Sequence, residues 1–251
     1  MHADLDFNCD LGEGCGDDAA IIPLLSSASI ACGFHAGDAR TMRDTVALCV
    51  RHGVAIGAHP SFADREHFGR RELPTAPDDV YALVRQQLDA LDALAREQGA
   101  RVRHLKPHGA LYNLAARDRA IADAIAAATH DVDPGLWLVG LSGSALTDAG
   151  AALCLRVAHE AFAERRYEAD GTLTPRALPG AVIDTLDETL AQVRGLLRDG
   201  AVTTRTGERV ALRMDTLCLH GDRPDAVAFA RALRDTLQAE GVRIRAPGST
   251  A

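Results

Sequence analysis

The sequence predicts an α/β fold in which seven or eight β/α units close into a barrel. Short apolar runs, typical of buried parallel strands, alternate along the chain with amphipathic helical stretches. Polar residues follow several of the apolar runs directly, as they do at the mouth of a β/α barrel. The length of 251 residues suits one such barrel. A doubly wound open sheet is the alternative architecture.

Eight apolar runs have the length of buried strands. They span residues 5–9, 29–32, 54–58, 102–106, 136–140, 154–158, 216–220 and 242–245. Three helices have clear boundary signals. Asp38 can cap the first, and residues 78–98 carry apolar positions at a period of 3.6 before they stop at Gly99. The third spans residues 224–240, where Pro224 suits a first turn.

Two further segments have their own signatures. Residues 201–213 predict a β-hairpin, because β-forming flanks surround Thr206-Gly207. Residues 159–181 lack periodicity and carry many charges, so they predict a long loop, which in a compact protein is often functional. Because no linker, repeat or low-complexity tract interrupts the chain, we expect one domain over residues 1–251.

The composition argues against several classes of function. A formal net charge of -8 and only 4% aromatic residues disfavour binding to nucleic acids and to anionic membranes. No apolar run is long enough for a membrane helix, and the first residues lack the pattern of a secretory signal. The six cysteines form no C-x-x-C pair. We therefore expect a reduced, cytoplasmic protein.

Histidines gather at the ends of the expected strands. Five of the ten lie there, namely His35, His59, His108, His159 and His220. The first strand instead ends in Asn8, Asp10 and Glu13. Because the carboxyl ends of barrel strands form the catalytic face, these side chains are expected to converge at one mouth. A single histidine at a strand end is more often structural, as we expect for His104, but five together favour a site.

The loops after these strands add further candidates. Arg70 and Arg71 form a pair that can bind carboxylate or phosphate oxygens. One strand exit carries Lys106, His108, Tyr112 and Asn113, and the long loop carries Glu160, Arg165 and Arg176. The motif His220-Gly221-Asp222 predicts either an active-site aspartate or a cap for the last long helix.

Other motifs are weaker. Asp10, His35 and His59 could together hold a divalent metal ion, but a metal-free hydrogen-bonded cluster fits the sequence equally well. The chain contains no G-x-x-x-x-G-K-[ST] phosphate-binding loop. Residues 140–144 approach a G-x-S-x-G nucleophile motif, but a serine replaces the last glycine, so Ser142 ranks below the histidines.

Eight segments together resemble the LamB/YcsF family, to which the A subunit of the bacterial ATP-dependent 5-oxoprolinase belongs. They are FNCDLGEG (7–14), IACGFHAGD (30–38), VAIGAHPSF (54–62), FGRR (68–71), HLKPHGALYN (104–113), EAFAERRY (160–167), DGTLTPR (170–176) and CLHGD (218–222). They follow the family's order and approximate spacing. Ser29, Glu164 and Cys15 depart from it, standing where the family usually has asparagine, aspartate and an aromatic residue.

The resemblance implies a seven-stranded β/α barrel of the glycoside hydrolase/deacetylase type. It also implies hydrolysis of 5-oxo-L-proline to L-glutamate, coupled to the hydrolysis of ATP as co-substrate, in a complex with two other subunits. Because this chain has no phosphate-binding loop, the partner subunits are expected to carry much of the work on ATP. Whether a divalent metal takes part stays open.

On this basis, the candidate catalytic residues are Asp10, His35, His59, Lys106, His108 and Glu160. The candidate substrate-binding residues are Asn8, Glu13, Arg70, Arg71, Tyr112, Asn113, Arg165, Arg176, His220 and Asp222. Individual acid and base roles stay unassigned. The alternatives are a stand-alone metal-dependent deacetylase or amidase, and a non-catalytic scaffold subunit of a complex.

Overall fold

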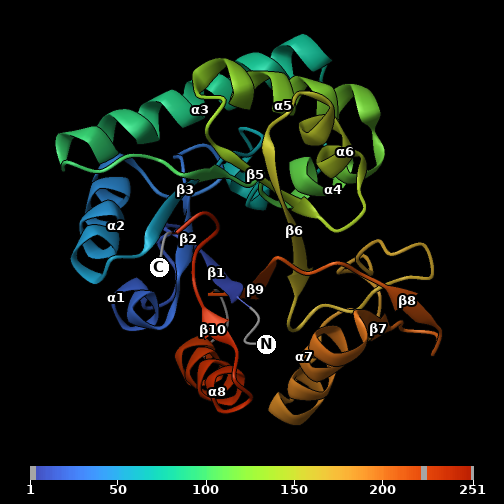
Figure 1. Ribbon diagram of the computed structural model, residues 1–251. Helices are drawn as coiled ribbons and strands as arrows, with labels where there is room; N and C mark the ends of the chain where they lie inside the picture. The colour runs from blue at the N-terminus through green and yellow to red at the C-terminus, as the bar shows by residue number, and fades with distance from the viewer. Residues whose placement is uncertain (1–3, 222–224, 250–251) are drawn as a thin grey trace.

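Seven parallel strands close into a barrel in the computed structural model, which describes residues 4–221 and 225–249 (Figure 1). In order around the barrel, they are β1 (Asp4–Leu11), β2 (Ser27–Ala31), β3 (Ala55–His59), β4 (His104–Leu105), β5 (Trp137–Leu141), β6 (Arg156–Phe162) and β9 (Thr216–His220). The pairing of β9 with β1 completes the circle. The predicted seven-stranded barrel is confirmed, and the open sheet is excluded.

The eighth expected strand, β10 (Arg243–Ile244), lies outside this circle. It pairs with Asp4 and Leu5, whereas β9 pairs with β1 only from Asp6 onward. β10 therefore extends the sheet at the end where β1 begins, far from the ends of the strands at which the candidate residues lie.

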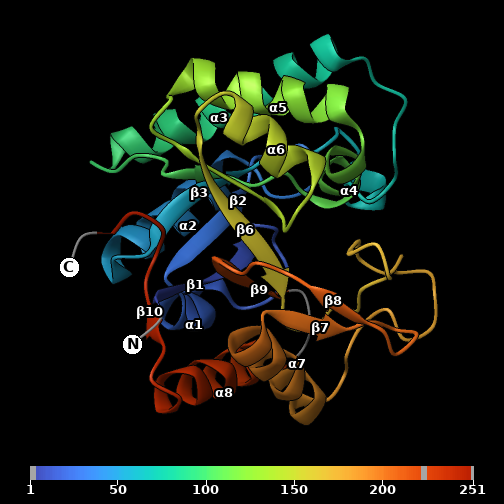
Figure 2. The same ribbon diagram turned by 45° about the vertical axis from the view of Figure 1, so that its right-hand side comes forward.

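Helices surround the barrel. Within the described residues, they are α1 (Asp18–Ile21), α2 (Ala39–His52), α3 (Pro77–Glu97), α4 (Gly109–Arg117), α5 (Arg119–Val132), α6 (Ala145–Ala152), α7 (Leu186–Asp199) and α8 (Ala226–Ala239), with the short 3-10 helices η1 (Ile22–Leu24) and η2 (Arg65–His67). Figures 1 and 2 show α3, α5 and α6 on one side of the strands and α7 and α8 on the other. No helix in this part of the chain is long and apolar enough to cross a bilayer.

The helix boundaries follow the capping signals in the sequence. At the start of α2, the Thr41 amide donates to the Asp38 carboxylate at 2.8 Å, and Gly53 adopts φ 66° just past the end. α3 begins at Pro77, as a helix with proline in its first turn can. Pro224, the proline expected in the first turn of the last long helix, lies outside the described residues.

An antiparallel hairpin forms where the sequence predicts one. It consists of β7 (Ala201–Thr203) and β8 (Arg209–Ala211), and Gly207 adopts φ 92° in the turn between them. The hairpin lies beside α7 and forms its own two-stranded sheet (Figure 2). That residues 1–251 form one domain stays a prediction.

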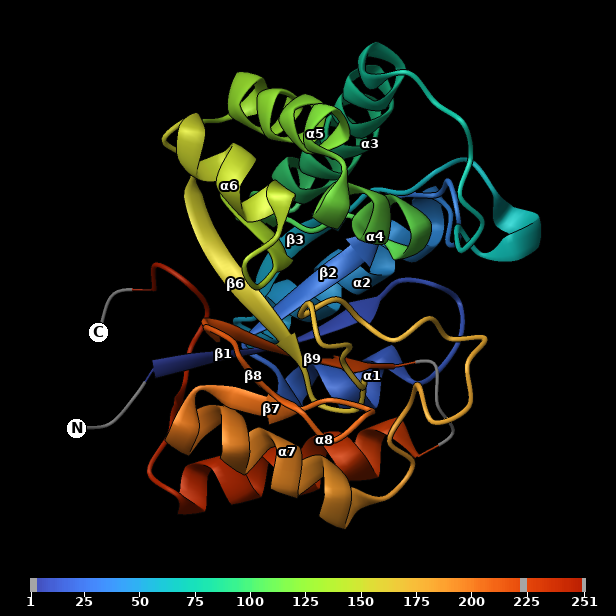
Figure 3. The ribbon, with the colours of Figure 1, turned by 90° about the vertical axis from the view of Figure 1, so that its right-hand side faces the viewer.

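β6 is longer than the sequence predicts. The expected strand ends at residue 158, but β6 continues because Glu160 pairs with β5 and Phe162 pairs with β9. The long loop therefore spans 163–185 and does not begin at residue 159. Tyr167 anchors it from a buried position, since its hydroxyl accepts a hydrogen bond from the Phe162 amide at 2.8 Å. Figure 3 shows this loop and the loop containing η2 at the same end of the barrel.

The interior of the barrel is polar. In β1, alternate residues such as Phe7 and Cys9 are fully buried in the apolar core that the helices cover. The residues between them, Asp6, Asn8 and Asp10, are also buried but make polar contacts across the barrel. The other strands contribute further buried polar side chains, including Ser27, Ser29, His104, Glu160 and Thr216. Apolar layers usually fill such barrels, so this interior requires a hydrogen-bonding network of its own.

Candidate active site

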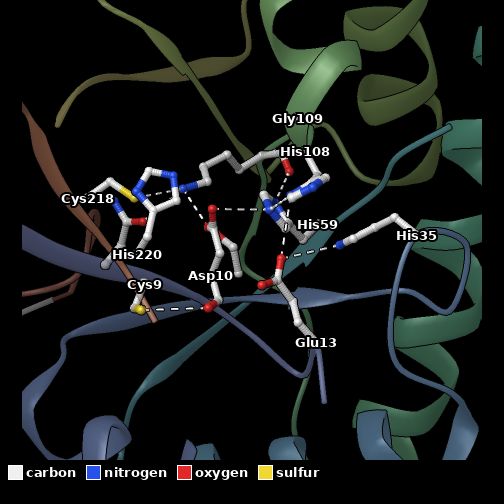
Figure 4. A network of polar contacts seen from close by, with 12 residues as sticks. Cys9, Asp10, Glu13, His35, His59, His108, Gly109, Cys218 and His220 are labelled. Carbon is white, nitrogen blue, oxygen red and sulfur yellow. Dashed lines mark hydrogen bonds and ion pairs between the residues drawn. The ribbon is translucent and has the colours of Figure 1, made fainter. Parts of the chain in front are cut away.

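Two neighbouring groups of side chains meet where the barrel strands end (Figure 4). The first, here called the lysine cluster, consists of Asn8, Asp10, Lys106, Glu160 and Cys218. The second, the histidine cluster, consists of Glu13, His35, His59 and His108. They meet between Asp10 Oδ2 and His59 Nε2, which lie 3.3 Å apart.

The lysine cluster encloses one ammonium group. Lys106 directly follows β4 and is 2% exposed. Its Nζ atom lies 2.6 Å from Asp10 Oδ1 and 2.9 Å from Glu160 Oε1, and it donates to Asn8 Oδ1 at 3.1 Å. An ammonium has three donors, so these three oxygens can satisfy it completely. The buried charge depends on them, because an unpaired ammonium would be strongly unfavourable there.

Lys106 is also the only lysine in the chain, since every other strongly basic residue is an arginine. A guanidinium is a planar fork, whereas an ammonium is a compact charge with three rotatable donors. The oxygens of Asn8 and Asp10 on β1 and of Glu160 on β6 therefore suit a lysine better than an arginine.

Opposite charges in the lysine cluster stabilise each other. Burial acts against the charged form of Lys106, but Asp10 and Glu160 outweigh it and raise the pKa of Lys106 well above its usual range. Burial likewise opposes the Asp10 carboxylate, yet His59 and Lys106 hold the pKa of Asp10 well below its usual range. Burial raises the pKa of the Cys218 thiol. At neutral pH, Lys106 and Asp10 are therefore charged and Cys218 is neutral.

A chain of hydrogen bonds continues below the lysine cluster. Asn8 Nδ2 donates to Glu160 Oε1 at 3.1 Å and to Thr216 Oγ1 at 2.6 Å. Thr216 donates in turn to Asp6 Oδ2 at 2.6 Å. Burial raises the pKa of Asp6, although three hydroxyl donors oppose this effect. This series of hydrogen bonds links β1, β6 and β9, and it fixes the orientation of the Asn8 amide group.

The polar atoms of the histidine cluster converge on one point. His108 Nδ1 lies 2.9 Å from His59 Nε2 and 3.5 Å from Glu13 Oε1. His35 Nε2 lies 3.4 Å from the same Glu13 oxygen, and the His35 ring stacks on His108 with centroids 3.9 Å apart. Figure 4 shows Glu13 between His35 on one side and His59 and His108 on the other.

Backbone carbonyls determine the tautomers of two of these rings. His59 Nδ1 lies 2.7 Å from the carbonyl oxygen of Lys106, and His108 Nε2 lies 2.9 Å from that of Phe68. A carbonyl oxygen can only accept, so each of these nitrogens carries a hydrogen and donates it. In the neutral rings, the remaining nitrogens, Nε2 of His59 and Nδ1 of His108, are unprotonated and face each other.

Burial keeps several of the histidines uncharged. Burial and the neighbouring His59 hold the pKa of His108 well below its usual range. Burial also lowers the pKa of His35. Beneath the cluster, in the barrel interior, burial together with the charge of Lys106 lowers the pKa of His104 to about 3. His35, His104 and His108 are therefore neutral at physiological pH.

Two glycines provide space and geometry for these rings. A Cβ atom on Gly57 would lie 1.9 Å from His104 Nε2, so β3 needs glycine at this position. After η2, Phe68 and Gly69 adopt φ values of 55° and 63°, and this left-handed turn brings the Phe68 carbonyl to His108. The FGRR stretch therefore contributes a backbone carbonyl and also the Phe68 ring, whose centroid lies 5.6 Å from that of His35 and 5.5 Å from that of His108.

Arginines lie around the mouth of the barrel. The Arg165 guanidinium is buried and donates to the carbonyl oxygens of Thr174 and Ala181, which ties the long loop together. Burial and the nearby charges of Arg176 and Arg70 lower the pKa of Arg165 to about 10. Three cationic groups therefore share one region of the mouth, and an anion there would be favourable.

His220 completes the mouth on the side of β9. Its Nδ1 atom and its backbone amide are hydrogen-bonded to the Glu164 carboxylate. The His220 ring stacks on Phe162 with centroids 5.6 Å apart. Burial opposes the charge of Glu164, but His220 lowers the pKa of this carboxyl group below its usual range.

Comparison with known proteins identifies the family of this chain. The profile of the LamB/YcsF family matches residues 5–251. The chain belongs to the LamB/YcsF family. The 5-oxoprolinase A subunit of Bordetella pertussis (strain Tohama I) is 53% identical over 251 residues, which cover 98% of this chain and all of that protein. The corresponding 5-oxoprolinase A subunit of Bordetella parapertussis (strain 12822) has the same identity and coverage.

A solved structure agrees with this family membership. The crystal structure of the lactam utilization protein from Thermus thermophilus superposes with a TM-score of 0.90 at 44% identity, covering 97% of this chain and 99% of that one. The resemblance seen in the sequence motifs is thus confirmed for the family and for the fold.

Most of the predicted site residues of this LamB/YcsF chain lie together. Eight of them make up the two clusters apart from Cys218, namely Asn8, Asp10, Glu13, His35, His59, Lys106, His108 and Glu160. Tyr112 is buried beside them; burial and the Glu160 carboxylate raise the pKa of its hydroxyl well above the usual range.

Other predicted residues lie elsewhere. Asn113 is exposed, and its amide donates to the Gly109 carbonyl within α4, because successive positions of a helix point in different directions. Arg71 is exposed and pairs with Asp64 in the same loop. Asp222 lies outside the described residues.

His159 does not reach the mouth, contrary to expectation. It lies within β6, next to Glu160, and neighbouring residues of a strand point to opposite faces. Glu160 points into the barrel, so His159 points outward, where its Nδ1 atom accepts a hydrogen bond from the Gly143 amide at 3.4 Å. Ser142 is likewise engaged outside the clusters, since its Oγ accepts from the Arg213 amide at 3.0 Å.

The potential metal ligands also differ from the expected set. Ligand atoms of Glu13, His35, His59 and His108 lie within 4.8 Å of one another. Asp10 is absent from this group: its Oδ1 atom lies against Lys106, although its Oδ2 atom lies 3.3 Å from His59 Nε2. The sequence predicted that Glu13 and His108 lie at the mouth, but it did not predict that they form one group of potential metal ligands with His35 and His59.

Sequence reasoning missed several residues that support the site. Asp6, Thr216, Cys218 and Glu164 were not among the site candidates. Thr216, Cys218 and Glu164 each contact one that was, and Asp6 accepts a hydrogen bond from Thr216. A signal for Asp6 was present in β1, where Asp6, Asn8 and Asp10 alternate with apolar residues at a period of two. Glu164 lies in the EAFAERRY segment, where the family usually has aspartate, but the sequence assigned it no role.

Proposed function

We propose that this chain is the A subunit of an ATP-dependent 5-oxoprolinase, which hydrolyses 5-oxo-L-proline to L-glutamate together with two other subunits. The observation that carries the proposal is the 53% identity, over their whole length, with curated proteins named as 5-oxoprolinase A subunits. The name of the Thermus thermophilus relative, a lactam utilization protein, supports the same class of substrate.

The reaction explains why ATP is required. A lactam carbonyl is an unreactive amide, and transfer of the γ-phosphoryl group of ATP to its oxygen forms an O–P bond and releases ADP. A water oxygen then bonds to the ring carbon, and the C–N bond breaks as its electron pair takes up a proton. The resulting acyl phosphate is hydrolysed by a second water to glutamate and phosphate.

The site has groups for the charges that this reaction creates. The arginines at the mouth suit the carboxylate of the substrate and its phosphoryl group, since guanidinium forks bind such oxygens. The lysine cluster keeps Asp10 ionised beside His59. The histidine cluster, in which the neutral His108 ring directs a bare nitrogen inward, is the part of the site assigned to the attacking water.

The nucleotide is assigned mainly to the partner subunits. A P-loop cradles phosphates through a glycine-rich backbone followed by lysine and serine or threonine, and this chain has no such motif. Its single lysine is enclosed by Asp10 and Glu160 and followed by a proline. This chain would then receive the activated ring and open it.

The decisive experiment assays glutamate formation and ATP hydrolysis in the presence of 5-oxo-L-proline, with this chain alone and with its two partner subunits. We expect glutamate only from the complete set. Asp10→Asn and His59→Gln should each lower turnover of the complex by about 100-fold or more. A complete complex that releases no glutamate would refute the proposal, and full activity of both variants would remove the site from it.

A further inference from the structure

With both rings neutral, two unprotonated nitrogens face each other in the histidine cluster. His59 Nε2 and His108 Nδ1 lie 2.9 Å apart, and the carbonyls of Lys106 and Phe68 hold the hydrogen of each ring on its other nitrogen. Two lone pairs at this distance repel each other unless a cation is bound to both. Glu13 Oε1 lies 3.5 Å from the His108 nitrogen and adds negative charge at the same point.

His35 and Glu13 add further unpaired atoms at this position. Both ring nitrogens of His35 and the Oε1 atom of Glu13 are buried and make no hydrogen bond. His35 is 2% exposed. Buried polar atoms in folded proteins are nearly always paired, so the Glu13 oxygen without a hydrogen bond, beside the facing nitrogens of His59 and His108, indicates that this point is built for a ligand.

We propose that the histidine cluster binds a divalent transition metal ion of the zinc type through His59 Nε2, His108 Nδ1 and a carboxylate oxygen of Glu13. Two imidazoles and one carboxylate are a donor set found in zinc sites that keep a further position open. Cations that prefer only oxygen ligands, such as magnesium and calcium, do not suit this set.

The surroundings of the two imidazoles fit the same assignment. A histidine that binds a metal almost always donates its other N–H to a carbonyl or carboxylate, and both rings do so here. Ligand nitrogens that each lie about 2.0–2.1 Å from one tetrahedral ion are about 3.3 Å apart, so the two rings, now 2.9 Å apart, need to separate by only a few tenths of an ångström.

His35 is assigned a positioning role. Its ring is nearly parallel to that of His108, with an interplanar angle of 6°, so the in-plane lone pairs of both rings cannot point at the same ion. His35 Nε2 instead lies 3.4 Å from Glu13 and can orient this carboxylate. Asp10 is not a ligand because Lys106 neutralises it. Of the three ligands that the sequence suggested, only His59 remains.

The test measures metal binding by the full chain alone, so it does not depend on whether the proposed function is correct. Cys15 and Cys154 are exposed thiols that could bind zinc themselves, and the experiment therefore uses a Cys15→Ser/Cys154→Ser background. After removal of metals with a chelator, zinc is titrated and quantified by elemental analysis. Cobalt is added in a parallel sample for visible spectroscopy.

We expect one equivalent of zinc per chain and cobalt bands without thiolate-to-metal charge transfer. His59→Gln and His108→Gln should weaken binding by more than about 100-fold, since loss of an outer partner alone typically costs about 10–100-fold. His35→Gln should fall within that smaller range. His159→Gln is the matched control, because this histidine faces away from the cluster, and should bind like the parent.

Glu13→Gln guards against loss of folding, because it keeps the size of the side chain and removes only its charge. Circular dichroism and a thermal melt establish that each variant is folded. Zinc should raise the melting temperature of the parent and of His159→Gln but not of Glu13→Gln. The proposal would be overturned if the parent bound less than one equivalent of zinc per chain, or if folded His59→Gln bound zinc as the parent does. A proton shared between the two rings would then explain their close approach.

Discussion

The lysine cluster and the histidine cluster lie side by side, yet they differ in whether their polar groups have partners within the protein. In the lysine cluster, Lys106 is matched by Asp10, Glu160 and Asn8, so every strong charge has a partner. In the histidine cluster, His59 and His108 direct bare nitrogens at each other, and His35 makes no hydrogen bond. The charges of the first are matched, although its Glu160 Oε2 atom makes no hydrogen bond, whereas in the second the Glu13 carboxylate faces ring nitrogens and no lysine or arginine. The comparison teaches that a buried polar residue is best interpreted by whether its partners are complete.

The largest effect is expected for Lys106→Met. Removing the ammonium leaves Asp10 and Glu160 buried without their cation, and breaking a buried ion pair in this way typically costs about 3–5 kcal/mol. The free energy of unfolding, measured with urea, should fall by this amount. The double variant Lys106→Met/Glu160→Gln should recover part of the lost free energy of unfolding. A loss below about 1 kcal/mol in the single variant would contradict the arrangement of matched charges around Lys106.

Matched carboxylate variants compare the clusters directly. Glu160→Gln removes a charged hydrogen-bond acceptor from Lys106 and should destabilise the protein by about 1.5–3 kcal/mol. Glu13→Gln removes a carboxylate whose Oε1 has no hydrogen bond and should change stability by less than about 1 kcal/mol, while lowering turnover of the assembled enzyme by about 100-fold. Equal losses of stability in the two variants would erase the distinction between the clusters.

The pH dependence of stability should reveal the neutral histidine beneath the clusters. The pKa of His104 is about 3 in the folded protein because of burial and the charge of Lys106, against an ordinary value of 6.5; Asp10 opposes this shift. Between about pH 6.5 and pH 3, the unfolded chain therefore binds up to one more proton than the folded protein, and stability falls as the pH falls through this range. Between pH 7 and 5 this amounts to about 2 kcal/mol.

Urea unfolding of the parent and of His104→Gln at both pH values isolates this contribution. The loss on acidification should be smaller in the variant by that amount, because glutamine does not titrate. Lys106 and Asp10 should contribute little to the change of stability between pH 5 and pH 7. The pKa of Lys106 is shifted above this range, and the pKa of Asp10 is shifted below it. A parent and a variant with the same slope would show that His104 is not held neutral.

The smallest effect is expected for Asn113→Ala. The side chain is exposed and bonds only to the Gly109 carbonyl within α4, so both stability and turnover should change little, with a stability change within about 0.5 kcal/mol. The assays described for the complex and for urea unfolding suffice. A large loss of turnover would show that this face of α4 contacts the substrate, as the sequence suggested.

Much of this arrangement could be predicted from the sequence because its signals are local. The eight strands follow from short apolar runs, and the convergence of His35, His59 and His108 follows from their places at strand ends. The length of β6 could not be predicted, since it depends on pairing with strands far away in the sequence. His159 and Asn113 were placed at the mouth although their side chains point away from it, because position in the sequence does not give the direction of a side chain within a strand or a helix.

The distinction between the clusters also lay beyond the sequence. Which oxygen Lys106 contacts, and which nitrogen of His108 carries the hydrogen, depend on ångström-scale positions set by several loops. The left-handed turn at Phe68 and Gly69 is an example, because it determines the state of a ring about forty residues away. Motif spacing reports which residues meet, but not which of their atoms do.

The solitary lysine makes this protein its own spectroscopic probe. A chain grown on isotope-labelled lysine contains a single labelled side-chain ammonium, that of Lys106, and it lies within the candidate site. Because this group is buried and held by three oxygens, its hydrogens should exchange slowly with water and give one resolvable resonance. Binding of substrate, of a metal ion or of unlabelled partner subunits could then be followed at the site itself, without altering any residue.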